Sequence, residues 1–248
     1  MNRLFFLLLS SFSVLLLCCA LTLQKKKLTI WMMGDSTMAI KAADKFPETG
    51  WGVPFAKLFK EHVAVVNAAK NGRSTKSFMR EGLWDEVYRG VEPEDYVLIQ
   101  FGHNDEKIDK PNTGVTIDEY KKNLSLFVEA VRKQSATPIL LSPIARRAFV
   151  DGVLQDTHKS YPQAVQKVAD SLQVSFIDLT KLSTDLLRRE GDLKSSALFL
   201  HLPQGAPNYP DGVIDNTHLN EKGAAAIAAL VTKELRRQRH PLAKELKK

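Results

Sequence analysis

The sequence has very little cysteine, and both cysteines lie near its start. Among 248 residues only Cys18 and Cys19 carry a thiol. The body of the chain that follows has none. Disulfide bonds, thiol catalysis and cysteine-based zinc sites are therefore excluded for that body.

Long hydrophobic runs are also scarce, with one exception at the N-terminus. An arginine precedes an apolar run over residues 4–17, and the small stretch Cys18-Cys19-Ala20 follows it. This pattern predicts a signal peptide over residues 1–20, with a secreted or periplasmic protein after its removal. Processing at either cysteine would instead leave a lipid anchor at the cell envelope. An uncleaved membrane anchor is disfavoured, because roughly 14 apolar residues are short for a spanning helix.

Negative charge is in deficit, since 35 Lys and Arg face 28 Asp and Glu for a formal net charge of +7. Much of the surplus lies in residues 25–27 and 236–248. We expect one domain over residues 24–240 and a basic C-terminal tail over 241–248. The basic runs have no aromatic residues between them, so nucleic acid is not an expected partner. A basic protein could still favour an anionic polymer.

Five short apolar runs rich in Val and Ile alternate with helical patterns. Such continuous runs are typical of buried parallel strands. They occupy residues 28–34, 63–69, 95–102, 137–144 and 174–179. The sequence therefore predicts an α/β fold, a three-layer α/β/α sandwich around a five-stranded parallel sheet.

Two helices are indicated with particular clarity. Apolar residues at helical spacing predict a helix over 118–135 with Asp118 as its cap, and Asn220 is expected to cap a final helix that ends near residue 239. The proline-containing segment 193–216 is expected to be an ordered loop at the edge of the sheet.

Polar motifs follow three of the predicted strands. These are "GDS" (34–36), "NGRS" (71–74) and "GHND" (102–105), and a fourth, "DNTH" (215–218), precedes the final helix. The carboxyl ends of parallel strands share one edge of a sheet, where ligands bind in open α/β folds. We therefore expect the four motifs to meet there.

These motifs contain the groups that acyl transfer needs. Ser36 can act as nucleophile, His218 as general base and acid, and Asp215 as the carboxylate that orients the imidazole. The backbone N–H groups of Ser36 and Gly72, with the side-chain amide of Asn104, can form an oxyanion hole. No metal or other cofactor is expected, because the histidines lack companions at ligand spacing.

Each of these residues also has a structural interpretation. Alone, Ser36 is more often a helix cap, Gly72 a residue at positive φ, Asn104 a turn former and Asp215 an Asx-turn. The hydrolase hypothesis is favoured because one geometry accounts for all four.

The order of the four motifs resembles that of the SGNH or GDSL hydrolases. This resemblance extends over nearly the whole mature chain and implies a flavodoxin-like fold with a Ser, Gly, Asn and His quartet. Within that superfamily the chain is most similar to the rhamnogalacturonan acetylesterases. The similarity rests on "GDSTMA" (34–39), "GWG" (50–52), "NAAKNGRSTKSF" (67–78), "QFGHND" (100–105) and "DNTHLNEKGA" (215–224).

The resemblance implies an esterase that removes acetyl groups from the galacturonic acid of pectin, with an acetylated polysaccharide or oligosaccharide as its partner. Arg73, Lys76 or Arg80 could contact the uronate. Alternatives are an acetylxylan esterase, or a lipase, lysophospholipase or thioesterase on the same fold. A catalytically silent sugar-binding protein is a further alternative. The oligomeric state is left open.

Overall fold

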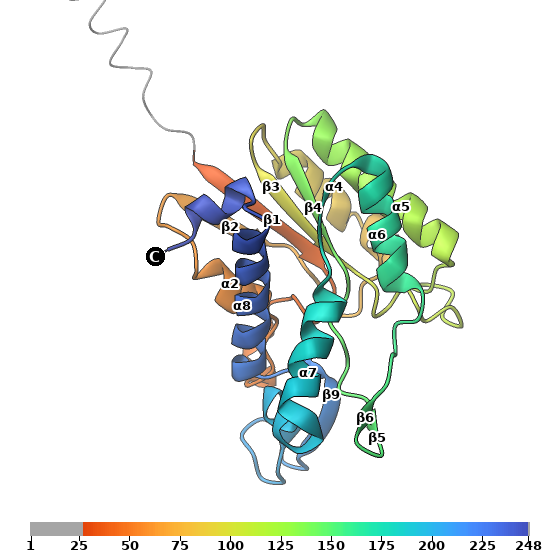
Figure 1. Cartoon of the computed structure of the whole chain (residues 1–248), viewed down its shortest axis with the longest axis vertical. Coiled ribbons are helices and arrows are strands. Elements are labelled where there is room, and N and C mark those ends of the chain that lie inside the picture. Colours follow the sequence, from red (N-terminus) through yellow and green to blue (C-terminus); the bar gives the residue numbers. More distant parts are fainter. Residues whose placement is uncertain (1–26, 248) are drawn as a thin grey trace, which may run out of the picture.

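A five-stranded parallel sheet forms the centre of the fold, with strand order β2-β1-β3-β4-β7 (Figure 1). The computed structural model describes residues 27–247, so the predicted signal peptide lies outside the described residues. The strands are β1 (Leu28–Gly34), β2 (Val63–Asn67), β3 (Tyr96–Gln100), β4 (Thr137–Leu141) and β7 (Ser175–Ile177). Each lies within one of the predicted apolar runs, and the predicted fold class is confirmed.

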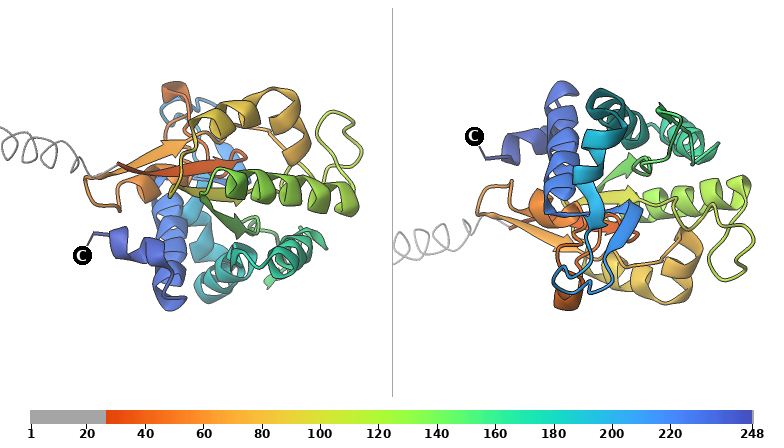
Figure 2. Two further views of the ribbon diagram at one scale, coloured as in Figure 1. Left: turned by 90° about the horizontal axis from the view of Figure 1, so that it is seen from above. Right: turned by 90° about the horizontal axis from the view of Figure 1, so that it is seen from below.

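Helices cover both faces of this sheet. One hydrophobic core joins the strands to α2 (Gly52–Ala56), α7 (Leu179–Ser195) and α8 (Glu221–Arg237). A second core, on the other face, joins them to α3 (Thr75–Arg80), α4 (Leu83–Gly90), α5 (Ile117–Lys133) and α6 (Tyr161–Leu172). Figure 2 shows the gold α4 and the blue α8 on opposite sides of the sheet. Burial on both faces explains why the strands are apolar throughout.

The two predicted helices differ in how they begin. Asn220 caps α8 as expected, accepting a hydrogen bond from the backbone of Gly223. The cap of α5 is Thr116 and not Asp118, because Thr116 and Glu119 form a reciprocal capping box. Asp118 lies in the first turn of the helix, where a carboxylate also favours the helix dipole.

The segment expected to be a loop over 193–216 contains an antiparallel hairpin. After α7 come a 3-10 helix, η2 (Ser196–Leu198), then β8 (Phe199–Leu202) and β9 (Val213–Leu219). The prolines lie in the connection between the strands, so only that connection is irregular. A smaller hairpin, β5 (Phe149–Val150) with β6 (Val153–Leu154), follows β4.

Residues after 240, expected as a tail, pack against the domain. A 3-10 helix, η3 (Pro241–Glu245), places Leu242 in the core with none of its surface exposed, and Leu246 pairs with Phe59. A further 3-10 helix, η1 (Ala43–Lys45), follows β1. Within residues 27–247 no helix is both long and apolar enough to cross a membrane.

Candidate active site

Ser36 lies in a tight turn directly after β1, near the middle of the sheet. The Asp35 carboxylate shapes this turn by accepting hydrogen bonds from the backbone N–H and hydroxyl of Thr37, at 2.9 and 2.7 Å. Gly34 is required just before the turn, because a Cβ there would lie 2.5 Å from the Gln100 carbonyl oxygen. The strand therefore ends by presenting Ser36 at its carboxyl edge.

The hairpin strand β9 brings Asp215 and His218 to the same edge. Asp215 Oδ2 lies 2.7 Å from His218 Nδ1, and His218 Nε2 lies 2.9 Å from Ser36 Oγ. Asp215 Oδ1 also accepts the backbone N–H groups of Thr217 and His218, at 2.7 and 2.9 Å. The structure thus joins three predicted site residues, 182 positions apart at their extremes, in one line of hydrogen bonds.

The ionisation state of Asp215 decides which atom donates and which accepts in each hydrogen bond of this line. Burial opposes its ionisation, but the hydrogen bonds from His218 and from the backbone of His218 and Thr217 hold the pKa of this carboxyl well below its usual range. An ionised carboxylate only accepts, so His218 Nδ1 carries the proton and Nε2 is left to accept from the Ser36 hydroxyl. This is the tautomer that a general base for serine needs.

The donors predicted for the oxyanion hole belong to Ser36 itself, Gly72 and Asn104. In the described chain the backbone N–H groups of Ser36 and Gly72 have no acceptor, and Gly72 adopts φ of +75°. Asn104 Nδ2 donates one hydrogen to the Arg73 carbonyl oxygen at 3.1 Å, which leaves its second hydrogen available. Lys107 Nζ donates to Asn104 Oδ1 at 2.8 Å and so fixes which end of the amide is which. The three residues that carry the predicted oxyanion donors line one cavity.

Asp105 joins the loop that carries Gly72 to the loop that carries Asn104. Its Oδ1 accepts the backbone N–H and the hydroxyl of Thr75, at 2.9 and 2.6 Å, just after the loop that carries Gly72. Complete burial raises the pKa of Asp105 to about 7. Asp105 therefore couples the position of Asn104 to that of Gly72.

A second histidine–carboxylate pair lies behind the serine turn. His103 Nδ1 is 3.2 Å from Asp35 Oδ2, and both side chains are buried. Burial lowers the pKa of His103 to about 4, so its ring is neutral near pH 7. Among residues 27–247 no serine hydroxyl forms a hydrogen bond with this ring, so His103 is not placed to act as the base.

These groups line one cavity of about 440 Å³. Ser36, Gly72, Asn104, Asp215 and His218 are part of its surface. The other lining residues are Glu48, Asn71, His103, Lys107, Arg146 and Thr217.

A partly buried ion pair supports the cavity wall next to Gly72. Lys41 Nζ contacts Glu48 at 2.6 Å and donates to Asn71 Oδ1 at 2.9 Å. This contact joins the loop after β1 to the loop after β2. It therefore holds the turn that carries Gly72.

Several lining residues were missed from the sequence. Lys107 is three positions after Asn104 and shares its turn, which is a signal that could have found it. Glu48 and Arg146 come from connections with no motif, so only the packing of the chain places them here.

The cations suggested for uronate binding have other partners. Arg73 contacts Glu81 at 2.7 Å, Lys76 donates to the Pro111 carbonyl oxygen, and Arg80 donates to Asn112. None of the three lines the catalytic cavity. Lys107 and Arg146 are the cations that do.

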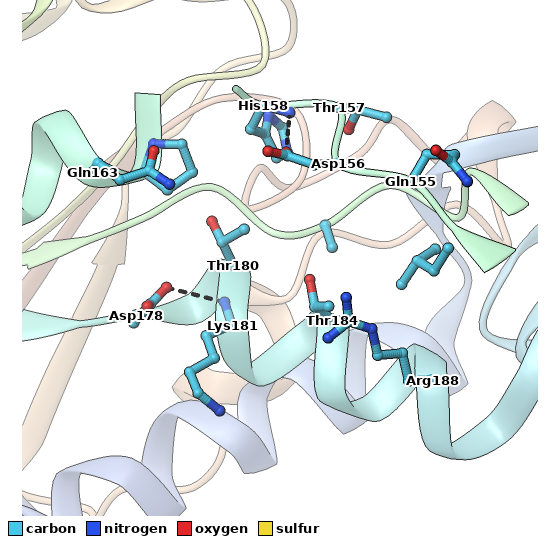
Figure 3. A pocket seen from close by; sticks show the side chains of 13 residues that line it. Gln155, Asp156, Thr157, His158, Gln163, Asp178, Thr180, Lys181, Thr184 and Arg188 are labelled. Atoms are coloured by element: carbon cyan, nitrogen blue, oxygen red, sulfur yellow. Dashed lines mark hydrogen bonds between the residues drawn. The ribbon is translucent and has the colours of Figure 1, made fainter. Parts of the chain in front are cut away.

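A second cavity, of about 240 Å³, lies between α7 and the segment that leads into α6 (Figure 3). Its side chains are mostly polar, among them Gln155, Asp156, Thr180 and Arg188. Its histidine, His158, has both ring nitrogens engaged, by Glu106 at 2.8 Å and the Ile144 carbonyl oxygen at 2.7 Å. That ring is not available as a base, so this cavity does not carry the serine chemistry.

A metal centre is not indicated by the described part of the chain. Residues 27–247 contain no group of three or more His, Cys, Asp or Glu side chains placed to hold a metal ion.

Known proteins are similar to this chain over most of its length. The model of the GDSL-like Lipase/Acylhydrolase family matches residues 32–226. The rhamnogalacturonan acetylesterase RhgT of Bacillus subtilis (strain 168) is 37% identical over 222 residues, which cover 89% of this chain and 94% of RhgT. The probable rhamnogalacturonan acetylesterase YesY of the same strain is 31% identical, with coverages of 88% and 96%.

Solved structures are similar as well. The crystal structure of YXIM from Bacillus subtilis superposes with a TM-score of 0.75 at 25% identity, over 87% of this chain and 58% of that chain. A catalytic mutant of the acetylxylan esterase Axe2 from Geobacillus stearothermophilus gives a TM-score of 0.61 at 20% identity, with coverages of 84% and 94%. At this level of identity the similarity to Axe2 shows a shared fold.

Proposed function

Because the chain belongs to the GDSL-like lipase/acylhydrolase family and is an esterase, we propose that it removes O-acetyl groups from a plant cell-wall polysaccharide through a serine acyl-enzyme. The single observation that carries the mechanism is the line from Asp215 through His218 to Ser36 Oγ, with contacts of 2.7 and 2.9 Å. That a carbohydrate is the substrate is supported by the acetylesterases among its relatives.

In this mechanism Ser36 attacks the acetyl carbonyl carbon while His218 Nε2 takes the hydroxyl proton. The oxyanion that forms accepts hydrogen bonds from the N–H groups of Ser36 and Gly72 and from Asn104 Nδ2. His218 then gives its proton to the departing sugar oxygen, and the acetyl group stays on Ser36. A water molecule, deprotonated by the same imidazole, releases acetate and restores the serine.

Asp215 keeps the imidazole in the required tautomer and stabilises the cation that forms. Its carboxylate is held by three hydrogen bonds, which fix its direction before the reaction starts. The reaction needs no group beyond these residues and water.

We propose rhamnogalacturonan as the polysaccharide, since the relatives RhgT and YesY carry that name and cover the chain almost completely. An acetylated xylan is the second candidate, supported by the likeness of fold to Axe2. The polar wall with Glu48, Lys107 and Arg146 favours a sugar over a long acyl chain, and so argues against a lipase. We further propose export, which rests on the apolar run at residues 4–17.

Acetate release tests both parts of this proposal. The mature protein and its Ser36→Ala variant are incubated with acetylated rhamnogalacturonan and, in parallel, acetylated xylan. Release from the pectic polymer that is lost in the variant is expected. Release from xylan alone would overturn the substrate, and activity that survives in Ser36→Ala would overturn the mechanism. Acetyl and octanoyl esters of one chromogenic alcohol then separate an acetylesterase from a lipase.

A further inference from the structure

A groove of about 570 Å³ adjoins the catalytic cavity. It lies between the turn after β3 and the first residues of α5 and α6, whose N-terminal ends reach the carboxyl edge of the sheet (Figure 1). Lys107 lines both spaces, so the groove begins where the catalytic cavity ends. A polymer held at Ser36 would extend into it.

Two lysines, Lys107 and Lys159, and two carboxylates, Glu106 and Asp109, line the groove. Glu106 is already engaged by Arg146 and His158, at 2.6 and 2.8 Å. Among residues 27–247 no carboxylate lies within 4.0 Å of the ammonium groups of Lys107 or Lys159 (the salt bridges formed are elsewhere). Arg146, in contrast, is already paired with Glu106 at 2.6 Å. Burial and the nearby charges of Lys110 and Arg146 lower the pKa of Lys107. An anion in contact with the Lys107 ammonium group would favour its charged form.

The rest of the groove suits a sugar ring. Ile108 is 71% exposed, and Ile117 also lines the groove, so the two offer apolar surface to the C–H face of a ring. Thr157 and Ser160 add hydroxyl groups. Sugars are bound by this combination of apolar contact and a few placed polar groups.

We propose that this groove binds the glycan chain next to the acetylated sugar, and that Lys107 and Lys159 contact the carboxylates of acidic sugars in that chain. The inference rests on the proposed function, because it places the remainder of that substrate. It assigns to Lys107 two contacts, the amide of Asn104 on one side and a uronate on the other.

Direct binding tests the groove separately from catalysis. The probe is an unacetylated trimer of galacturonate, titrated by calorimetry into the full chain carrying Ser36→Ala, with xylotriose as the neutral comparison. We expect the acidic trimer to bind at least about fivefold more tightly, and Lys159→Met to weaken it by about three- to tenfold, since one desolvated charge contact contributes about 1 kcal/mol. Raising sodium chloride from about 50 to 500 mM should also weaken the acidic trimer alone.

Two further variants sharpen the result. Lys107→Met should weaken acidic-trimer binding as Lys159→Met does, while Lys233→Met, on α8 and outside the groove, should not change it. Equal affinity for both trimers, or unchanged binding in both groove variants, would overturn the proposal. A failure of the proposed function would give a different result. The wild type would then release no acetate from an acetylated glycan, whether or not the acidic trimer binds.

Discussion

Replacing Asp215 by Asn should move the ring proton of His218 from Nδ1 to Nε2, with little change to the fold. Asn keeps one oxygen, which can still accept the backbone N–H groups of Thr217 and His218 that now lie 2.7 and 2.9 Å from Asp215 Oδ1. The other oxygen, 2.7 Å from His218 Nδ1, becomes an NH₂ group. That group donates, so Nδ1 must accept, and the proton moves to Nε2. An imidazole protonated at Nε2 cannot take the proton of Ser36.

The expected loss is large because the wrong tautomer removes the base altogether. In a serine enzyme with this arrangement an Asp to Asn change lowers kcat by about 10⁴-fold, which is about 5 kcal/mol of transition-state stabilisation. The cost in stability should be small by comparison, since the turn that holds β9 keeps its two backbone hydrogen bonds. We therefore expect a change of no more than about 1 kcal/mol in the free energy of unfolding.

The assay is hydrolysis of an aryl acetate near pH 7.5, with thermal unfolding of the same preparations. Asp211→Asn is the matched control, because Asp211 is an exposed carboxylate on the same hairpin, and it should keep wild-type activity. A loss of less than about tenfold in Asp215→Asn, at unchanged stability, would refute the orienting role of Asp215. A loss that merely follows unfolding would show up as a lower melting temperature.

Three other outcomes follow from the contacts described above. Asn104→Ala should lower kcat for an aryl acetate by about 100- to 1,000-fold with little change in KM, because one oxyanion donor is lost; an equal rise in KM would contradict this. Burial raises the pKa of Asp105 from 3.8 to about 7, so ionisation of this carboxyl lowers the free energy of unfolding by about 4 kcal/mol as pH rises from about 4 to 7. In urea unfolding, the stability of Asp105→Asn should therefore decline less over that range than the stability of the wild type. Parallel declines in the two proteins would contradict this prediction. Gly223→Ala should lower stability by about 1 to 3 kcal/mol in thermal unfolding, because the new Cβ would lie 1.8 Å from the Leu198 carbonyl oxygen, whereas Ala225→Ser on the exposed side of α8 should not.

The strands of the parallel sheet and the polar motifs that follow them could be predicted from local sequence patterns. Apolar runs at residues 28–34, 63–69 and 95–102 indicated strands because a strand buried on both faces has no polar positions. The turns after them had to share one edge, since parallel strands end together. The meeting of Ser36 with Gly72 and Asn104 was therefore predictable from local patterns alone.

Other features of the fold depend on contacts that the local sequence does not show. The prolines of the segment around β8 and β9 indicated a loop. The prolines lie only in the connection between the two strands, however, and β8 and β9 pair because each supplies the other's hydrogen bonds. Thr116 rather than Asp118 caps α5, a difference of two residues that the geometry of the capping box decides.

Lining residues of the catalytic cavity that lie outside the motifs were also hard to predict from the sequence. Glu48 and Arg146 line the cavity because connections of the chain pack together there, and no motif marks a residue whose neighbours come from other elements. Lys107 is the exception, because it shares the turn of Asn104. The charges that line the cavity are therefore a property of the folded chain, whereas the strands and the polar groups that follow them could be predicted from the sequence.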